Sequence, residues 1–168
     1  VAALDVSDDP LDLPDARRHL LRGLDGLSLV LARQGLSEEA LAVVDDAARA
    51  FIRRFLPGPV TVILQAKSCL PEILTGGTGL IGIRWSDHDV VIAIIARFDS
   101  PITATSANVS DSSPPTRPGE VSIPNDYLVD GGELPGTPST VVDLTTRRIL
   151  RKGAAWEAVE AFLETLQA

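Results

Sequence analysis

The sequence contains very little of several residue types, and each shortage excludes a class of site. It has one cysteine, Cys69, no methionine and only two histidines, His19 and His88, within 168 residues. A single cysteine excludes an internal disulfide and fits a reducing, cytoplasmic environment. The two histidines lie far apart and outside any cysteine cluster, so no metal site of the zinc type is expected.

Long apolar runs are also missing. No stretch approaches the ~20 apolar residues that a membrane helix needs, so no membrane association is expected. The first residues, Val1 to Asp9, become acidic at once, which predicts no cleaved secretion signal. With 168 residues, 45% of them hydrophobic, the chain can bury a full core, and we expect one domain over residues 1–168.

Positive charge is scarce. Lys67 and Lys152 are the only lysines, and the net charge is −8. Because nucleic-acid phosphates are bound mainly by Lys and Arg, this balance argues against a general nucleic-acid coat. Any anion site must therefore be local and built from a few arginines. The densest basic group is Arg147, Arg148, Arg151 and Lys152. It is either a solvated strand edge or a place where one inward arginine grips a nucleotide phosphate.

Apolar periodicity predicts alternating strands and helices. Strands are expected at Leu27–Ala32, Val60–Leu64, Leu80–Arg84, Ile102–Thr105, Asp126–Val129, Ser139–Leu144 and Arg148–Arg151, and helices from Ser37 to Phe55, from Asp87 or Asp89 to Phe98, and from Ala155 to Leu166. This interleaving predicts an α/β sheet domain. The short spacings late in the chain imply some antiparallel pairing.

Small polar residues are concentrated in the run from Thr103 to Ser110, which follows the apolar Pro101–Ile102 and includes Ser106 and Asn108. Hydroxyls and a carboxamide at the end of a strand are suited to a polar ligand at a sheet edge. The same residues are equally typical of a capped turn. The residues of this run alone do not decide between these interpretations.

Arginine and serine mark two further sheet margins. Arg84 ends an apolar strand, where its guanidinium can bind a carboxylate or phosphate in a fork or pair with Asp87 or Asp89. Ser139 begins a later strand. No Ser/His/Asp triad or paired carboxylates are recognisable. Polar positioning with arginine electrostatics suits phosphoryl or nucleotidyl transfer better than acid–base hydrolysis.

Five ordered motifs resemble the YrdC-like family of L-threonylcarbamoyladenylate synthases. They are Phe55–Leu64 (F-W-P-G-P-x-T), Gly82–His88 (G-V-R-x-P-x-H), Thr105–Ser110 with Thr116 (T-S-A-N-x-S), Pro138–Asp143 (P-S-T-V-V-D) and Ile149–Ala154 (L-R-x-G-A). The resemblance is strongest over residues 51–154. It implies a twisted, open mixed sheet flanked by helices, with a concave binding face.

The resemblance also implies an activity. The substrates would be L-threonine, bicarbonate and ATP with Mg²⁺, and the products threonylcarbamoyl-AMP and pyrophosphate, so that the protein would be a nucleotidyltransferase. Its product would feed a partner protein that makes threonylcarbamoyladenosine (t6A) in tRNA. The concave face in this family is also associated with binding of tRNA or double-stranded RNA.

Site residues can be carried over from the matching motifs. Ser106 and Asn108 would be catalytic, and Ser106 would bind threonine together with Arg84 and Ser139. ATP would be bound by Asn108, Thr116 and Arg151, and no residue is assigned to a protein-bound metal.

The start of the chain departs from the family pattern. Neither P-T-E/D-T-x-Y-G-L nor K-x-R is present, and Arg22 stands alone where K-x-R is expected. Missing cations near a triphosphate predict reduced or absent turnover, since one well-placed electrostatic group is commonly worth about 10²–10³ in rate. Three alternatives follow: a synthase in which Arg22 or Arg33 replaces those cations, a degenerate relative that binds nucleotide or threonine without efficient turnover, or an RNA-binding module.

Overall fold

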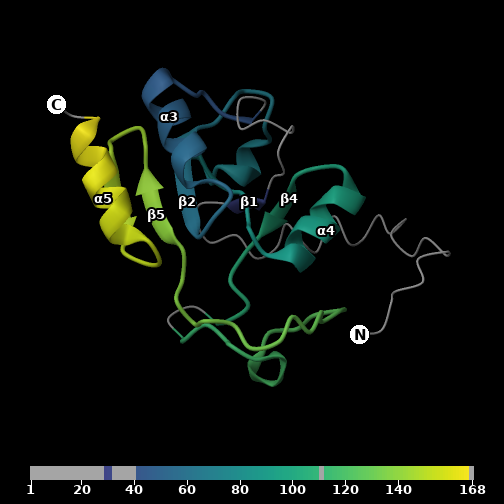
Figure 1. The fold of residues 1–168 in the computed structure, drawn as a ribbon. Coiled ribbons are helices and arrows are strands. Elements are labelled where there is room, and N and C mark those ends of the chain that lie inside the picture. Colours follow the sequence, from purple (N-terminus) through teal and green to yellow (C-terminus); the bar gives the residue numbers. More distant parts are fainter. Residues whose placement is uncertain (1–28, 32–40, 110–111, 167–168) are drawn as a thin grey trace.

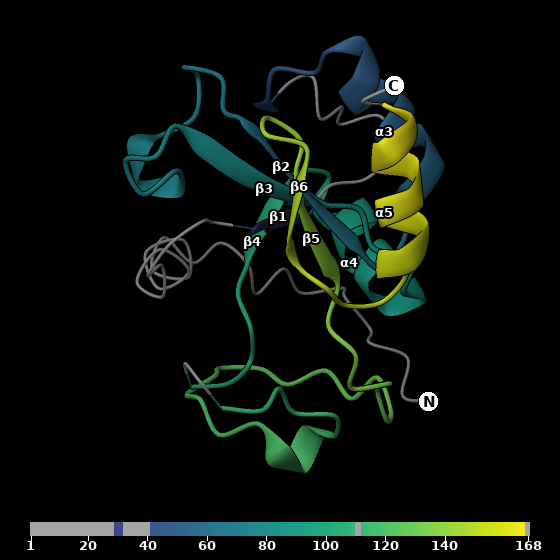
Figure 2. The same ribbon diagram turned by 90° about the vertical axis from the view of Figure 1, so that its left-hand side faces the viewer.

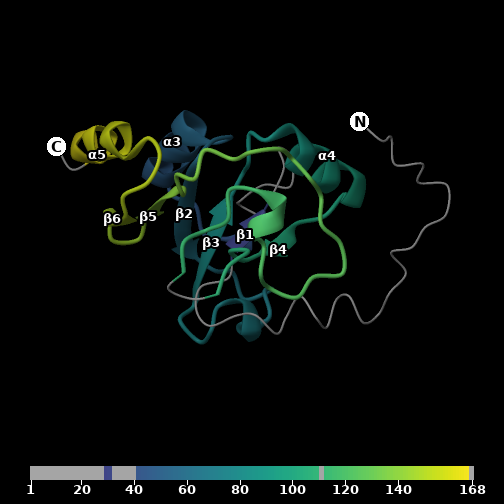
Figure 3. The same ribbon diagram turned by 90° about the horizontal axis from the view of Figure 1, so that it is seen from below.

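A computed structural model describes residues 29–31, 41–109 and 112–166. Within these residues, six strands form one mixed sheet in the order β4-β1-β3-β2-β5-β6 (Figures 1 and 3). The strands are β1 (Leu29–Leu31), β2 (Val60–Gln65), β3 (Leu80–Arg84), β4 (Ile102–Ala104), β5 (Thr140–Asp143) and β6 (Arg148–Arg151). The pairs β1–β3 and β2–β5 are parallel and the other three are antiparallel. The predicted mixed sheet is confirmed.

Three α-helices within the described residues lie on one side of this sheet, as Figures 2 and 3 both show. They are α3 (Asp46–Phe55), α4 (Asp89–Phe98) and α5 (Trp156–Thr165), with the short 3₁₀ turns η1 (Glu72–Leu74) and η2 (Pro118–Glu120) in the connections. Each of the three helices has ten residues. None of the helices in the described part of the chain has the length and apolar character required to cross a membrane.

The core lies between the sheet and helices α3 and α5. Alternate residues of β2, beginning with Val60 and Val62, are buried against Phe51 of α3 and Val159 of α5. Since successive strand residues point to opposite faces, Thr61 lies on the face away from these helices. The alternation therefore assigns β2 an apolar face for the core and leaves a polar residue on the other face.

The predicted helix from Ser37 to Phe55 is interrupted within the described residues, where Leu41 is helical, residues 42–45 are not, and α3 begins at Asp46. The predicted start at Ser37 lies outside the described residues, but Ala42 forms a bridge with Ala66, and the Val43 backbone N–H donates to Gln65 at 2.8 Å. The backbone here therefore pairs with the end of β2 instead of forming a helix. Asp45 then caps α3, its carboxylate accepting from the Ala48 N–H at 2.7 Å.

This cap leads to a stability prediction. Asp45→Ala leaves the Ala48 N–H without its partner and should lower the free energy of unfolding by about 1 kcal/mol, while Asp45→Asn, which keeps an acceptor, should cost much less. Urea unfolding followed by circular dichroism measures both. Equal losses in the two variants would show that the hydrogen bond is not what stabilises this helix start.

One predicted strand is absent. Asp126–Val129 forms no strand, and Tyr127, Leu128 and Val129 in it are 79%, 52% and 55% exposed. Residues 112–138 contain no strand that could pair with it, and Figure 2 shows the segment between β4 and β5 extending away from the sheet. Its β-branched and aromatic composition favoured a strand, but without a neighbouring strand its backbone cannot form a ladder.

Candidate functional site

A row of residues crosses four strands at one end of the sheet. The register pairs Val62 with Ile83, so Thr61 lies one step further along, opposite Arg84. Thr61 is paired with Val141 of β5, and Val141 with Arg151 of β6. Residues directly opposite each other share a face of a sheet. The register therefore brings Arg84, Thr61 and Arg151 to the face that α3 and α5 do not cover.

Ser139 is the centre of a hydrogen-bond network in this row. Its hydroxyl lies 2.9 Å from the Thr61 hydroxyl, and both residues are buried. The Arg151 guanidinium donates to the Ser139 carbonyl from Nε at 3.1 Å and from Nη2 at 3.0 Å, and Nη2 also donates to Ser139 Oγ at 3.1 Å. Two of the three guanidinium nitrogens of Arg151 are thus committed to Ser139, and Nη1 has no hydrogen bond to a described residue.

A bulge in β6 directs Arg151 to this position. Val141 is paired with Arg151 and Val142 with Ile149, so Leu150 is an extra residue in the ladder. Leu150 is 59% exposed. Bulges commonly re-aim a side chain next to a functional site. Here the bulge lets Arg151 face Ser139 while Ile149 still packs against the core.

A close backbone contact holds Ser139 from the other side. A Cβ on Gly153 would lie 2.2 Å from the Pro138 carbonyl oxygen and 2.6 Å from the Ser139 carbonyl carbon. The Ala154 N–H donates to the Pro138 carbonyl at 2.9 Å. Only glycine permits this approach. The L-R-x-G-A and P-S-T-V-V-D motifs are therefore packed against each other at Ser139.

Arg84 is half-buried and incompletely paired. Its Nε is buried and has no hydrogen-bond partner. Burial lowers the pKa of the Arg84 guanidinium; the Asp87 carboxylate opposes this shift, and the positive charge of Arg151 adds to it. The alternative that Arg84 is neutralised by a salt bridge to Asp87 or Asp89 is not observed among the described ion pairs. Two cations thus lie near each other, and each has a donor available for an anion, Nε of Arg84 and Nη1 of Arg151.

Ser106 and Asn108 lie elsewhere in the register. Strand β4 runs antiparallel to β1, and Ile102 rather than Ala104 is level with the β1 residue that pairs with Arg84. The chain therefore leaves β4 at the end of the β1–β4 pair that lies away from Arg84, and the segment that follows runs back to Ser139 before β5 (Figure 2). Ser106 is exposed. The Asn108 amide nitrogen donates to the carbonyls of Val109 at 3.0 Å and Ser112 at 2.8 Å.

Asn108 nevertheless keeps one free acceptor. Its Oδ1 is buried and has no hydrogen-bond partner. The two bonds of its amide nitrogen are those of a local turn, as the capped-turn interpretation expects, while the orphaned oxygen leaves room for a ligand donor. The structure therefore contains elements of both interpretations of this polar run.

Thr116 belongs to the segment between β4 and β5. The Glu120 carboxylate accepts from the Thr116 N–H at 2.8 Å and from its hydroxyl at 3.2 Å. The hydrogen bond from the Thr116 N–H, more than any other contact, holds the pKa of the Glu120 carboxyl below its usual value. Arg117 pairs with Glu133 at 2.8 Å, which joins the two arms of the segment.

The structure thus brings three of the six predicted site residues together. Arg84, Ser139 and Arg151 share one end of the sheet, whereas no described hydrogen bond or ion pair joins Ser106, Asn108 or Thr116 to them. Arg22 and Arg33, the candidates for replacement cations, lie outside the described residues. The roles of all six residues stay predictions.

Two residues in this region were given no role by the sequence interpretation. Thr61 lies in the P-G-P-x-T motif, and only its register shows that it contacts Ser139. His88 precedes α4, and its Nδ1 is buried without a partner. A Cβ on Gly131 would lie 3.5 Å from the His88 ring, so the ring reaches the distant connection before β5. The placement of His88 in G-V-R-x-P-x-H was the only signal available.

The dense basic group is largely used internally. Arg147 Nη1 donates to the Leu166 carbonyl at 2.8 Å. Lys152 pairs with Glu160 at 3.1 Å and lies 3.7 Å from the centre of the Trp156 ring. Arg148, Arg151 and Lys152 are exposed at the edge strand β6, so the group is a solvated strand edge from which Arg151 also binds Ser139.

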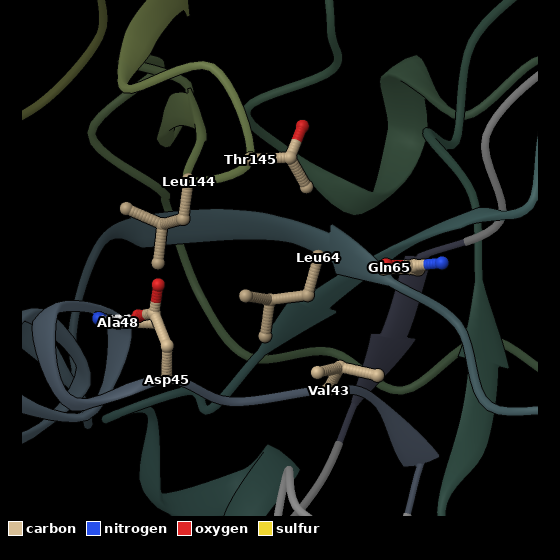
Figure 4. Close-up of a pocket in the computed structure, with 7 residues that line it drawn as sticks. All are labelled: Val43, Asp45, Ala48, Leu64, Gln65, Leu144 and Thr145. Carbon is tan, nitrogen blue, oxygen red and sulfur yellow. Dashed lines mark hydrogen bonds between the residues drawn. The ribbon is translucent and has the colours of Figure 1, made fainter.

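A pocket of about 250 Å³ lies at the other end of β2 from Thr61 (Figure 4). It is lined by Val43, Asp45, Ala48, Leu64, Gln65, Leu144 and Thr145. None of the predicted site residues is among them.

Asp143, the last residue of P-S-T-V-V-D, has a structural role. Burial raises the pKa of its carboxyl, but hydrogen bonds from Thr145 and Thr146 outweigh burial and hold the pKa low.

Metal ligands do not gather in the described ranges 29–31, 41–109 and 112–166, where no three His, Cys, Asp or Glu side chains come together. At the Ser139 end of the sheet, two arginines and the hydroxyls of Ser139 and Thr61 are the groups that can recognise an anion.

The sequence is similar to those of one known protein family. The profile of the Sua5/YciO/YrdC family, described as "Telomere recombination", matches residues 25–153. The threonylcarbamoyl-AMP synthase of Pyrococcus abyssi is 34% identical over 109 residues, which cover 61% of this chain and 32% of that protein. The synthase of Escherichia coli O1:K1 is 33% identical over 115 residues, covering 66% of this chain and 60% of that protein. The chain thus spans about a third to three fifths of the length of these curated relatives.

Solved structures agree with the sequence comparison. The crystal structure of P. abyssi Sua5 complexed with L-threonine has a TM-score of 0.74 and 30% identity, covering 86% of this chain and 47% of that one. The crystal structure of E. coli YciO has a TM-score of 0.71 and 25% identity, covering 84% of this chain and 74% of that one. The fold, the ordered motifs and these similarities lead to one conclusion: the chain belongs to the Sua5/YciO/YrdC family.

Proposed function

We propose that the Ser139 end of the sheet binds L-threonine beside ATP and forms threonylcarbamoyl-AMP. The observation that carries this proposal is Arg84, whose buried Nε has no partner while Arg151 stands near enough to lower the pKa of its guanidinium. A bound anion would give that nitrogen an acceptor and offset the repulsion between the two cations. The carboxylate of threonine has the charge and the two oxygens that a guanidinium fork requires.

The reaction requires three substrates to be held together. The threonine amine adds to the carbon of bicarbonate with loss of water, and an oxygen of the resulting carbamate attacks the α-phosphorus of ATP. The bond to the β-phosphate breaks, and pyrophosphate leaves. In this proposal Arg84 and Ser139 bind the threonine carboxylate, and Nη1 of Arg151 donates to a phosphate. Most of the catalysis would then come from positioning and charge stabilisation.

Ser106, Asn108 and Thr116 lie on the segment that leaves β4 and returns to Ser139, and they are proposed to complete the site from that segment. The buried, unpartnered Oδ1 of Asn108 can accept from the amino group of the adenine ring or from a ribose hydroxyl. Thr116 would release Glu120 or bind ATP through its remaining lone pairs. The threonine ligand of P. abyssi Sua5 supports the choice of amino acid through the family relationship.

Pyrophosphate release tests the proposal. We expect release from ATP that requires both L-threonine and bicarbonate, with product confirmed by mass spectrometry. Asn108→Ala and Arg151→Ala should each weaken ATP binding by about tenfold or more, the loss that follows from removing one hydrogen-bonding group to a charged ligand. Arg97→Ala, at an exposed position on α4, is the matched control.

The alternatives give different results in the same experiment. Thermal stabilisation by ATP and threonine without any pyrophosphate would replace the synthase with a ligand-binding relative that does not turn over. Stabilisation by RNA but not by ATP would favour an RNA-binding module instead. Unchanged ATP affinity in both Asn108→Ala and Arg151→Ala would remove these residues from the site.

A further inference from the structure

The buried hydroxyls of Thr61 and Ser139 are in hydrogen-bond contact, and the groups around them determine which one donates. Ser139 is 7% exposed and Thr61 is 6% exposed, and their oxygens lie 2.9 Å apart. Either hydroxyl could donate. A hydroxyl has one proton to donate and two lone pairs that accept, so the neighbouring groups decide the direction.

Arg151 limits the choices of Ser139. Its Nη2 donates to Ser139 Oγ at 3.1 Å, and a guanidinium can only donate, so one lone pair of Ser139 is occupied. An anionic ligand between Arg84 and Arg151 can only accept, so Ser139 must give it its single proton. With that proton used, the contact with Thr61 remains a hydrogen bond only if Thr61 donates to the second lone pair.

We propose that Thr61 is a positioning residue that fixes Ser139 as a pure donor toward the carboxylate of the bound amino acid. This inference rests on the function proposed above and deepens it by assigning the specificity of that site. With both lone pairs occupied by Thr61 and Arg151, Ser139 cannot accept a hydrogen bond from a ligand. The site therefore favours a carboxylate, which accepts, over an alcohol, whose hydroxyl can also donate.

The packing of Thr61 is consistent with this role. It stands in the row between Arg84 and Val141, on the face away from the core, although its neighbours Val60 and Val62 are core residues. A valine would fill the same space at this buried β2 position. The threonine hydroxyl is therefore not needed for the shape of the strand, and within the described residues its one hydrogen bond is to Ser139.

Thr61→Val tests the inference because it removes the hydroxyl and keeps the shape. We expect L-threonine to bind about five- to tenfold more weakly, as for the loss of one hydrogen bond in a charged site. Binding of L-threoninol, in which a hydroxymethyl group replaces the carboxylate, should be unchanged or tighter, because Ser139 regains a lone pair. The dissociation constant for L-threoninol divided by that for L-threonine, both measured by calorimetry, should fall about tenfold.

Thr61→Ser is the matched control. It keeps the donor hydroxyl and should restore most of the wild-type ratio. In a Ser139→Ala background, Thr61→Val should have almost no further effect on threonine, because the group through which it acts is gone. A role in folding alone would weaken both ligands equally and would not be rescued by serine.

The results separate this inference from the proposed function. If the wild type binds L-threonine and Thr61→Val leaves the threoninol-to-threonine ratio unchanged, the positioning role is wrong and the proposed function stands. Equal weakening of both ligands would likewise overturn the positioning role alone. If the wild type, shown to be folded by circular dichroism, binds no threonine at millimolar concentration, with or without ATP, the proposed function fails and takes this inference with it.

Discussion

Replacing Arg84 with methionine should weaken threonine binding strongly while leaving the protein as stable as the wild type, or more stable. Charge-assisted hydrogen bonds to a partly desolvated carboxylate are worth about 2–4 kcal/mol, so the affinity for L-threonine should fall about 30- to 1000-fold. Methionine occupies a similar volume without a charge. Calorimetry measures the binding, and thermal unfolding measures the stability.

The stability half of this prediction follows from what Arg84 lacks. Its Nε is buried without a partner, and burial together with the charge of Arg151 lowers the pKa of its guanidinium more than Asp87 raises it. A lowered pKa for a base means that the folded environment disfavours the charged form. Removing such a charge often leaves stability unchanged or raises it, and since Arg84 is only half-buried we expect a gain of about 0–2 kcal/mol after solvent screening.

Arg97→Met provides the comparison, because Arg97 is an exposed arginine on α4, away from the row of site residues. It should change neither threonine binding nor the melting temperature appreciably. A marked drop in the melting temperature of Arg84→Met with threonine binding intact would make Arg84 a structural residue. That result would also remove the observation on which the proposed function rests.

Local patterns in the sequence predicted the elements well where apolar periodicity was regular. Strands β2 and β3, helix α4 and helix α5 all lie within a residue or two of their expected bounds. The errors arose where a distant partner decides the backbone. Ala42 and Val43 pair with the end of β2 and interrupt the predicted helix, and Asp126–Val129 has no strand beside it. Neither fact is written in the local propensities of those segments.

The candidate site shows the same division. Arg84, Ser139 and Arg151 were chosen from motifs, but their adjacency depends on β2 lying between β3 and β5. That strand order also explains why Thr61 was overlooked, since nothing near position 61 in the sequence indicates a contact with position 139. Ser106 and Asn108 were expected at the carboxyl edge of the sheet, but β4 is antiparallel to β1, and both residues lie on the segment that runs from β4 to Ser139.

Replacing Gly153 with alanine adds one methyl group and should destabilise the folded protein strongly. The new Cβ would lie 2.2 Å from the Pro138 carbonyl oxygen and 2.6 Å from both carbonyl atoms of Ser139. These are backbone atoms, so no side chain can rotate away to make room. We expect a loss of about 3 kcal/mol or more in the free energy of unfolding, which corresponds to a melting temperature lowered by about 6–12 °C.

The same substitution should also disable the site in molecules that remain folded. The only way to relieve the contact is to move Pro138 and Ser139 away from β6, which lengthens the hydrogen bonds from Arg151 to Ser139 and the one between the hydroxyls of Ser139 and Thr61. Threonine affinity should therefore fall even well below the melting temperature. Gly119→Ala is the control, because a Cβ there meets nothing within 4 Å. If Gly153→Ala and Gly119→Ala unfold at the same temperature, the close backbone contact of Gly153 with Pro138 and Ser139 is wrong. The hydrogen bonds assigned to Ser139 would then lose their structural basis.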